Sequence, residues 1–257
     1  MSRGDFRQSP IPLAPPPTPI DVGIVAAMGI EIAPILLRLE GVRKYAAQGT
    51  TIVEGTLAGK LVAIVETGVG RARAQVGAER LILGHRPRWL VSAGFAGGLD
   101  PGLSRNRVVY PVEVVNVEGR VFPITAPPGW SPPPPAVHSG RLLTTDEIVI
   151  TAAGKAELHR VHGAALVDME TSAVAATSAQ HRVKFLSIRI ISDDASTDLP
   201  REVLSILGGS GSYRVGKAIG AIWRRPSSLK ELLALREQGN ISARHLATAF
   251  LQLLPTL

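Results

Sequence analysis

Two carboxylates stand where short apolar runs of the sequence end. Glu170 comes just after the run that begins at Leu166, and Asp193 closes a second run that begins at Ser187. If both runs are strands of an α/β sheet, their carboxyl ends line the edge where such sheets bind ligands. We therefore expect the two side chains to point into one cleft. Paired carboxylates at that place suit sugar recognition and proton donation, which is the chemistry of glycosidic bond cleavage.

A third carboxylate and two glycine-containing stretches also follow predicted strands. Glu31 stands in the first turn of a predicted helix, where it either serves a ligand or complements the helix dipole. Gly94-Phe-Ala-Gly-Gly98 offers bare backbone, which suits close contact with a ligand or a sharp turn. Gly68-Val-Gly70 has Arg73 where a dinucleotide-binding fingerprint requires a third small residue, so a tight turn into a helix is favoured. No phosphate-binding loop motif is present.

Cofactor chemistry finds little support in the sequence. The six histidines show no metal-ligand spacing, and cysteine is absent, which removes disulfides and thiolate metal sites. We therefore expect neither a metal nor an organic cofactor. The lack of cysteine also fits a cytoplasmic location.

The composition indicates a globular chain that does not bind nucleic acid. The chain has 257 residues, of which 45% are hydrophobic, enough for one sizeable core. The net charge is +7, but the basic residues are spread singly and only 4% of residues are aromatic, which argues against nucleic-acid binding. A solvated basic face or attraction to a membrane surface explains the charge better. The mean hydropathy is +0.19 and no apolar run is long enough to cross a membrane.

Periodicity along the chain predicts strands that alternate with helices. The expected strands span 21–27, 51–54, 61–67, 89–98, two short stretches within 108–121, 141–145, 166–168 and 184–191. The expected helices span 30–40, 71–83, 152–161, 170–181 and two segments after 228 that are separated at Asn240.

This order predicts an α/β fold in three layers, with a central mixed sheet flanked by helices. We expect residues 1–20 to be a disordered Pro-rich leader, 21–199 to form the main domain, and 200–257 to be a helical extension packed on that domain. A Gly/Ser break is expected at 208–212. The proline-rich stretch 126–135 is expected to be an exposed excursion because proline cannot donate a backbone hydrogen bond.

Taken together, several short motifs resemble the nucleoside phosphorylase/nucleosidase superfamily, and within it the methylthioadenosine/S-adenosylhomocysteine nucleosidase branch. The motifs occur in the family's order across roughly residues 21 to 196. They are Gly23-Ile-Val-Ala-Ala-Met-Gly-Ile-Glu-Ile-Ala-Pro34, Thr67-Gly-Val-Gly70, Gly94-Phe-Ala-Gly-Gly-Leu-Asp-Pro-Gly-Leu103, Val167-Asp-Met-Glu170 and Arg189-Ile-Ile-Ser-Asp-Asp-Ala195.

The resemblance implies a role for each matching residue in cleaving the N-glycosidic bond of a purine nucleoside. Asp193 matches the acid that protonates or hydrogen-bonds to purine N7, and Glu31 matches the carboxylate that activates the attacking water. Glu170 matches the residue that binds the ribose hydroxyls. The remaining positions implied to line the substrate are Met28, Gly94, Phe95, Ile148, Val149 and Met169.

Three of these positions depart from the family pattern. Phe95 stands where the family usually has serine, and Ser92 stands where phosphorylases have the arginine that holds phosphate. Since a bound anion needs charge-assisted donors, these two positions favour hydrolysis over phosphorolysis. Ile148 replaces an aromatic that stacks on the base. A phosphorylase with an altered phosphate site, and a non-catalytic nucleoside-binding protein on the same fold, are the two alternatives.

The resemblance extends to the tail and to partners. The C-terminal part is similar to the tail of hopanoid-associated phosphorylase-like proteins, which are implicated in removing adenine from an adenosylated lipid. Arg224, Arg225 and Lys230 beside leucine-rich faces would suit a lipid headgroup surface, although an ordinary packing extension is slightly favoured as the explanation. The expected substrate is therefore a 5′-substituted adenosine, either small or lipid-linked, and the expected assembly is a homodimer.

Overall fold

The computed structural model describes residues 19–47, 50–130, 138–199 and 227–257, with backbone only for 227–235. Almost all of the predicted leader, the second half of the proline-rich stretch, the Gly/Ser break at 208–212 and the basic residues Arg224 and Arg225 lie outside the described residues. No helix in the described ranges combines the length and the apolar character needed to cross a membrane.

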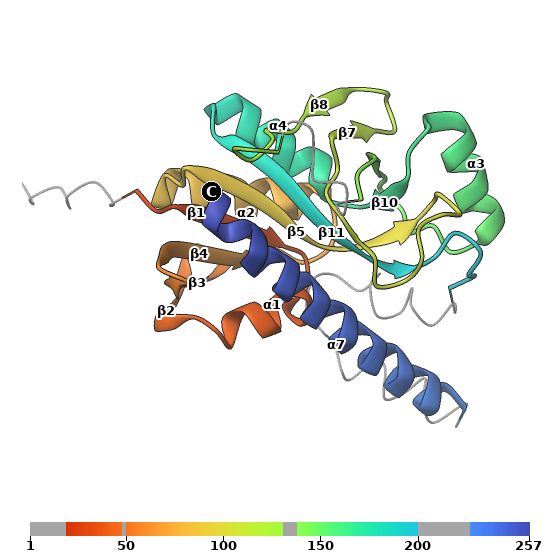
Figure 1. Ribbon diagram of the computed structural model, residues 1–257, viewed down its shortest axis with the longest axis horizontal. Coiled ribbons are helices and arrows are strands. Elements are labelled where there is room, and N and C mark those ends of the chain that lie inside the picture. The colour runs from red at the N-terminus through yellow and green to blue at the C-terminus, as the bar shows by residue number, and fades with distance from the viewer. Residues whose placement is uncertain (1–18, 48–49, 131–137, 200–226) are drawn as a thin grey trace, which may run out of the picture.

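One mixed sheet forms the centre of the described chain (Figure 1). Its strands are β1 (Val22–Ala26), β2 (Glu40–Ala47), β3 (Thr50–Leu57), β4 (Lys60–Glu66), β5 (Trp89–Gly98), β6 (Val108–Val109), β7 (Glu113–Asn116), β8 (Val121–Pro123), β9 (Arg141–Thr144), β10 (Leu166–Asp168) and β11 (Lys184–Asp193). The helices are α1 (Gly29–Leu36), α2 (Arg71–His85), α3 (Ala152–His162), α4 (Thr171–His181) and α7 (Ser227–Leu253), followed by the 3-10 turn η1 (Leu254–Thr256).

Strand β5 organises the sheet around the candidate site. It runs parallel to β1 on one side and to β11 on the other, and its last residues pair antiparallel with β10. Gly97 of β5 therefore lies opposite both Val167 of β10 and Asp193 of β11. This pairing brings the end of β11 and the start of α4, which follows β10, to the same edge of the sheet.

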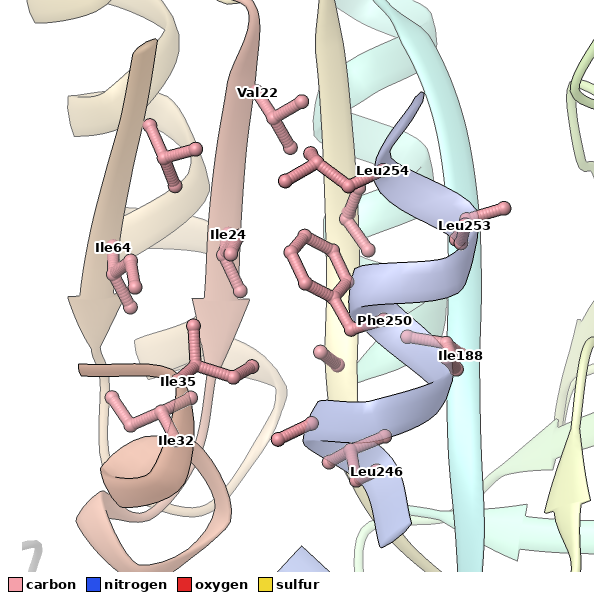
Figure 2. Close-up of a cluster of buried hydrophobic side chains, with 14 of the residues drawn as sticks. Val22, Ile24, Ile32, Ile35, Ile64, Ile188, Leu246, Phe250, Leu253 and Leu254 are labelled. Atoms are coloured by element: carbon pink, nitrogen blue, oxygen red, sulfur yellow. The ribbon is translucent and has the colours of Figure 1, made fainter. Parts of the chain in front are cut away.

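Helices cover both faces of the sheet and bury separate apolar clusters. Helix α7 lies at the front of Figure 1 and packs against β5 and β11, whereas α2 and α4 pack together on the opposite face of the sheet. Figure 2 shows the front cluster, where Ile32 and Ile35 of α1 and Phe250 of α7 pack against Ile24 of β1. The rear cluster joins α2 and α4 to the other face. The three-layer α/β fold with a central mixed sheet is confirmed.

Most predicted elements are present, with three corrections. The first helix ends at Leu36 rather than near residue 40, and the chain continues into β2, an edge strand that the sequence did not indicate. Hydrophobic periodicity missed β2 because an edge strand of this kind buries few apolar residues. A third short strand, β8, follows the two expected within 108–121.

The third correction concerns the C-terminal helix. Asn240 was expected to end one helix, but α7 runs unbroken from Ser227 to Leu253. A Cβ at the preceding residue, Gly239, would lie 3.0 Å from Cδ1 of Ile30, so glycine there allows α7 to approach α1 closely. The burial of Leu246, Phe250 and Leu253 against the sheet outweighs the weak helix propensity of Gly239 and Asn240.

Candidate active site

Glu31 is held at the start of α1 by two backbone amides. Its Oε2 accepts a hydrogen bond from Met28 N at 2.8 Å, which caps the helix, and its Oε1 accepts one from Phe95 N at 2.8 Å. The side chain is buried, and this burial raises the pKa of the carboxyl group even though the two amides and nearby Arg189 oppose the rise. Glu31 therefore complements the helix end and also faces β5.

Glu170 stands at the N-cap position of α4, and its side chain reaches the glycine turn before α2. Its Oε1 accepts a hydrogen bond from Gly70 N at 2.7 Å, and its Oε2 accepts one from Met169 N at 3.3 Å. Gly70 has a φ of +108°, a conformation that favours glycine. The Gly68-Val-Gly70 stretch is thus a tight turn into a helix, and its last amide also belongs to the candidate site.

The pKa of Glu170 is raised to about 8, first by burial and then by the negative charge of Asp168. Arg189 and the Gly70 amide act in the opposite direction, and Glu31 adds to the rise. The effect of Glu31 on the pKa of Glu170 indicates that the two carboxyl groups lie in the same part of the site.

Arg189, which is almost fully buried, supplies the positive charge of this group. Its Nη2 forms an ion pair with Asp168 Oδ2 at 2.7 Å and donates to Ser92 Oγ at 2.5 Å. A Cβ at Gly94 would lie only 2.4 Å from Arg189 Nη1 and 2.7 Å from Glu31 Oε1, so the guanidinium and the carboxylate both press against bare backbone of β5. Glycine is required at position 94 for this reason.

Sequence reasoning missed both Arg189 and Asp168 as parts of the site. The sequence positions that hold phosphate in phosphorylases carry no cation here, yet the fold brings a guanidinium to β5 from β11. Both residues stand inside motifs that carry the family resemblance, which was the available signal. The pairing itself could not be predicted because Arg189 and Asp168 lie on different strands.

Asp193 lies across Gly97 from β10, and a second cation holds it. Its Oδ2 accepts a hydrogen bond from Lys155 Nζ at 2.5 Å, and its Oδ1 accepts one from Ser192 Oγ at 2.6 Å. A Cβ at Gly97 would lie 3.3 Å from Val167 Cγ1 and 3.4 Å from Asp193 Oδ2, so the carboxylate lies directly against this part of β5. Nothing in the sequence marks Lys155 as part of the site, because a lysine in a short amphipathic helix normally faces solvent.

The remaining candidate residues lie in three parts of the fold. Met28 and Met169 are half-buried, and their backbone amides bind Glu31 and Glu170, respectively. The ring of Phe95 packs with the front cluster and lies 3.8 Å from a Cβ position at Gly239 of α7. Ile148 and Val149 lie in the connection from β9 to α3, where Val149 packs against the cluster of Leu99, Val115, Leu143, Ala164 and Val167.

The geometry gathers acid–base groups at one edge of the sheet. Glu31, Glu170 and Asp168 lie around the guanidinium of Arg189, and Asp193 stands further along the same strand, β11, with its own ammonium partner. Such a site can take a proton from water at one carboxylate and support a leaving group at another. It can also stabilise positive charge that develops between them.

Comparisons with known proteins find matches over most of the chain. The model of the phosphorylase superfamily matches residues 21–136 and 129–207. A 5′-methylthioadenosine/S-adenosylhomocysteine nucleosidase of Shewanella sp. (strain MR-7) is 27% identical over 216 residues, which cover 75% of this chain and 92% of that protein.

Solved structures share the fold at lower identity. The nucleosidase of the same description from S. pneumoniae, with a transition-state inhibitor, has a TM-score of 0.70 at 18% identity and covers 92% of this chain and 99% of that one. A futalosine hydrolase of Helicobacter pylori has a TM-score of 0.68 at 17% identity and covers 93% and 97% of the two chains.

Proposed function

Because the chain belongs to the phosphorylase superfamily, we propose that it hydrolyses the N-glycosidic bond of a purine nucleoside. The substrate is a 5′-substituted adenosine, and the released base is adenine. Support comes from the curated relatives, which are described as 5′-methylthioadenosine/S-adenosylhomocysteine nucleosidases. It also comes from the arrangement of carboxylates at the edge of the sheet.

The observation that carries this proposal is the environment of Glu31. A buried carboxylate with a raised pKa is a stronger base than an exposed one, and two backbone amides fix its direction. Glu31 takes a proton from the attacking water, and the hydroxide oxygen bonds to the anomeric carbon. Positioned bases of this kind contribute about 10²–10⁴-fold to the rate.

Glu170 holds the ribose, and the acidic group as a whole stabilises the sugar in the transition state. As the bond to the base breaks, the sugar gains oxocarbenium character, and nearby negative charge stabilises it. A hydroxyl of the ribose donates to the Glu170 carboxylate, so substrate binding favours the ionised form of this side chain. Met28, Met169 and Ile148 provide apolar walls around the sugar and the base, and the backbone of Val149 contacts the edge of the adenine.

Asp193 assists the departure of the base. The bond between N9 of the purine and the anomeric carbon breaks, and the electron pair stays on the base. Asp193 in its protonated form gives its proton to N7, which neutralises the charge that develops there, and the ammonium of Lys155 stabilises the carboxylate that remains. Water, Glu31 and Asp193 thus account for each proton without a cofactor.

Hydrolysis is favoured over phosphorolysis by the pairing of Arg189. Phosphate binding needs a cation that is free to make charge-assisted hydrogen bonds. Among the described residues, only Nη2 of Arg189 is paired, with Asp168 and Ser92, but the acidic groups Asp168 and Glu31 lie beside the same guanidinium and the same glycine of β5. A phosphate dianion beside these carboxylates would be repelled.

We further propose that the protein works as a homodimer in the cytoplasm, on the strength of the family resemblance and the absence of cysteine. If the substrate is a lipid-linked adenosine, the protein must reach a membrane surface. We propose that Arg224, Arg225 and Lys230 then make this contact. Light scattering during size-exclusion chromatography measures the mass of the assembly and so tests the homodimer. Sedimentation with anionic and neutral vesicles measures binding to membranes and so tests the membrane association.

A base-release assay tests the proposed function. Purified protein is incubated with methylthioadenosine, S-adenosylhomocysteine, inosine and a lipid-linked adenosine, and free base is quantified by chromatography. We expect release of adenine from at least one 5′-substituted adenosine and much less hypoxanthine from inosine. Binding of these compounds without release of any base would support a non-catalytic nucleoside-binding protein instead.

A further inference from the structure

Lys155 is a fully buried cation with every donor in use. Its side chain on α3 has 0% exposure. The ammonium donates to Asp193 Oδ2 at 2.5 Å, to Asp194 O at 2.8 Å and to Thr197 O at 2.8 Å. An ammonium has three N–H groups, so none remains for a substrate, and Lys155 does not touch the reacting atoms.

The three acceptors belong to one short segment that carries Asp193. Residues 193–197 leave the end of β11, and Lys155 joins the first, second and last of them. The start of α3 is fastened to the next residues, because Ala152 N donates to Asp198 Oδ1 at 2.7 Å and Leu199 N donates to Ile150 O at 2.8 Å. Helix α3 and the residues just before it therefore hold the segment 193–197 in place.

The carboxyl group of Asp193 is fixed on both oxygens as a result. Lys155 holds Oδ2 and Ser192 holds Oδ1, over the bare backbone of Gly97. Burying an ammonium is costly, and apolar residues that replace a buried ion pair are often neutral or stabilising. Stability alone is therefore a weak reason for a lysine at position 155. A role in orienting the carboxylate of Asp193 explains the lysine better.

We propose that Lys155 is the positioning residue of Asp193 in the departure of the purine base. This inference rests on the proposed hydrolase function and adds a residue that acts only through another. Loss of Lys155 leaves the carboxyl group of Asp193 free to rotate and frees the 193–197 segment. Departure of a poor leaving group such as adenine then slows, whereas attack of water at the anomeric carbon, which depends on Glu31, does not.

Two substrates that differ only in the leaving group separate these steps. Adenine needs help at N7, whereas 4-nitrophenolate leaves as a stable anion without a proton. The experiment compares wild type, Lys155→Met, Asp193→Asn and the double variant on methylthioadenosine and on the 4-nitrophenyl riboside with the same 5′ group. Lys184→Met, an exposed lysine at the other end of β11, is the matched control.

For Lys155→Met we expect kcat on methylthioadenosine to fall toward the Asp193→Asn value, within the range of about 10²–10⁴-fold for a general acid. KM and the rate on the 4-nitrophenyl riboside should change little, and the double variant should be no slower than Asp193→Asn. Lys184→Met should match wild type on both substrates. Thermal unfolding checks that each variant is folded, and Lys155→Gln replaces Lys155→Met if the latter is not.

A proportional loss on both substrates, or fully additive losses in the double variant, would overturn the positioning role. Unchanged kcat on methylthioadenosine in a folded Lys155 variant would overturn it as well. A wild-type protein that cleaves neither substrate would instead overturn the proposed function on which the inference rests. The two failures are thus distinguishable by the wild-type rate.

Discussion

Glu31 shows how single side chains at this site combine structural and chemical roles. Each of its oxygens accepts a different backbone amide, one from the start of α1 and one from β5. The carboxylate therefore joins two layers of the fold while its burial raises its pKa. A substitution that keeps the shape of Glu31 but changes its hydrogen bonding tests both its structural role and its role as a base.

Glu31→Gln should impair both activity and stability. A glutamine has one acceptor oxygen, so its NH₂ group must face either the Met28 or the Phe95 amide, and one buried donor loses its partner. We expect a loss of about 1–3 kcal/mol in the free energy of unfolding and a fall in kcat of about 10²–10⁴-fold. Chemical denaturation and the base-release assay measure the two effects. Wild-type kcat in this variant would exclude Glu31 as the base.

The raised pKa of Glu170 predicts that the stability of the protein depends on pH. Its pKa is about 8 in the folded protein against 4.5 for an ordinary glutamate, so between these values the folded state holds a proton that the unfolded chain has lost. The free energy of unfolding should therefore fall as pH rises from about 4.5 to about 8. Glu170→Gln, which is neutral at all pH values, should flatten this decline. Thermal unfolding of both proteins across that range is the measurement.

Asp193→Asn should lose activity and also some stability. The amide cannot neutralise Lys155, and breaking a buried ion pair on one side costs up to about 3–5 kcal/mol. Replacing Lys155 by methionine in the same chain should restore much of the lost stability without restoring activity. Denaturant unfolding of the single and double variants shows whether this happens. Equal stability of Asp193→Asn and wild type would mean that the ion pair adds nothing to the fold.

At the level of elements, strand β5 holds the site together because its glycines let other side chains reach its backbone. Gly94 faces Glu31 and Arg189, and Gly97 faces Asp193. The strand also pairs with β1, β10 and β11, the elements that deliver or precede the acidic residues. A side chain added to β5 should therefore disturb the site more than the fold.

Gly94→Ala tests this expectation. The new Cβ would lie 2.4 Å from Arg189 Nη1 and 2.7 Å from Glu31 Oε1, so one of the two must move. A displacement of about 1 Å in a catalytic group can lower the rate by about 10²-fold. Gly84→Ala on α2 is the matched control, because its Cβ would meet no neighbour. We expect near-wild-type base release from Gly84→Ala and a large loss from Gly94→Ala.

The elements also show what the sequence can and cannot predict. Buried strands such as β1, β5 and β10 were predicted closely because they read as short apolar runs bounded by glycine or charge. Edge strand β2 and the unbroken α7 were not, since tertiary packing determines them. The carboxylates could be found from their places at strand ends and from the family motifs. Lys155 could not, because nothing in its local sequence reveals that Asp193, Asp194 and Thr197 accept its hydrogen bonds.

At the level of the whole molecule, α7 packs beside α1 and covers the front face of the sheet. Phe250 is fully buried in this cluster (Figure 2). Replacing it by alanine should lower the free energy of unfolding by about 3–5 kcal/mol. Thr248→Ala on the exposed side of the same helix should change it by less than about 0.5 kcal/mol. A small effect of Phe250→Ala in denaturant unfolding would mean that α7 contributes little to the stability of the core.

The most direct test of the central claim follows the oxygen of water. The protein is incubated with methylthioadenosine in ¹⁸O-labelled water, with and without phosphate, and the sugar product is analysed by mass spectrometry. Hydrolysis predicts one ¹⁸O atom on the released sugar and equal rates of adenine release in both buffers. Formation of a ribose 1-phosphate, or release of adenine only when phosphate is present, would contradict it.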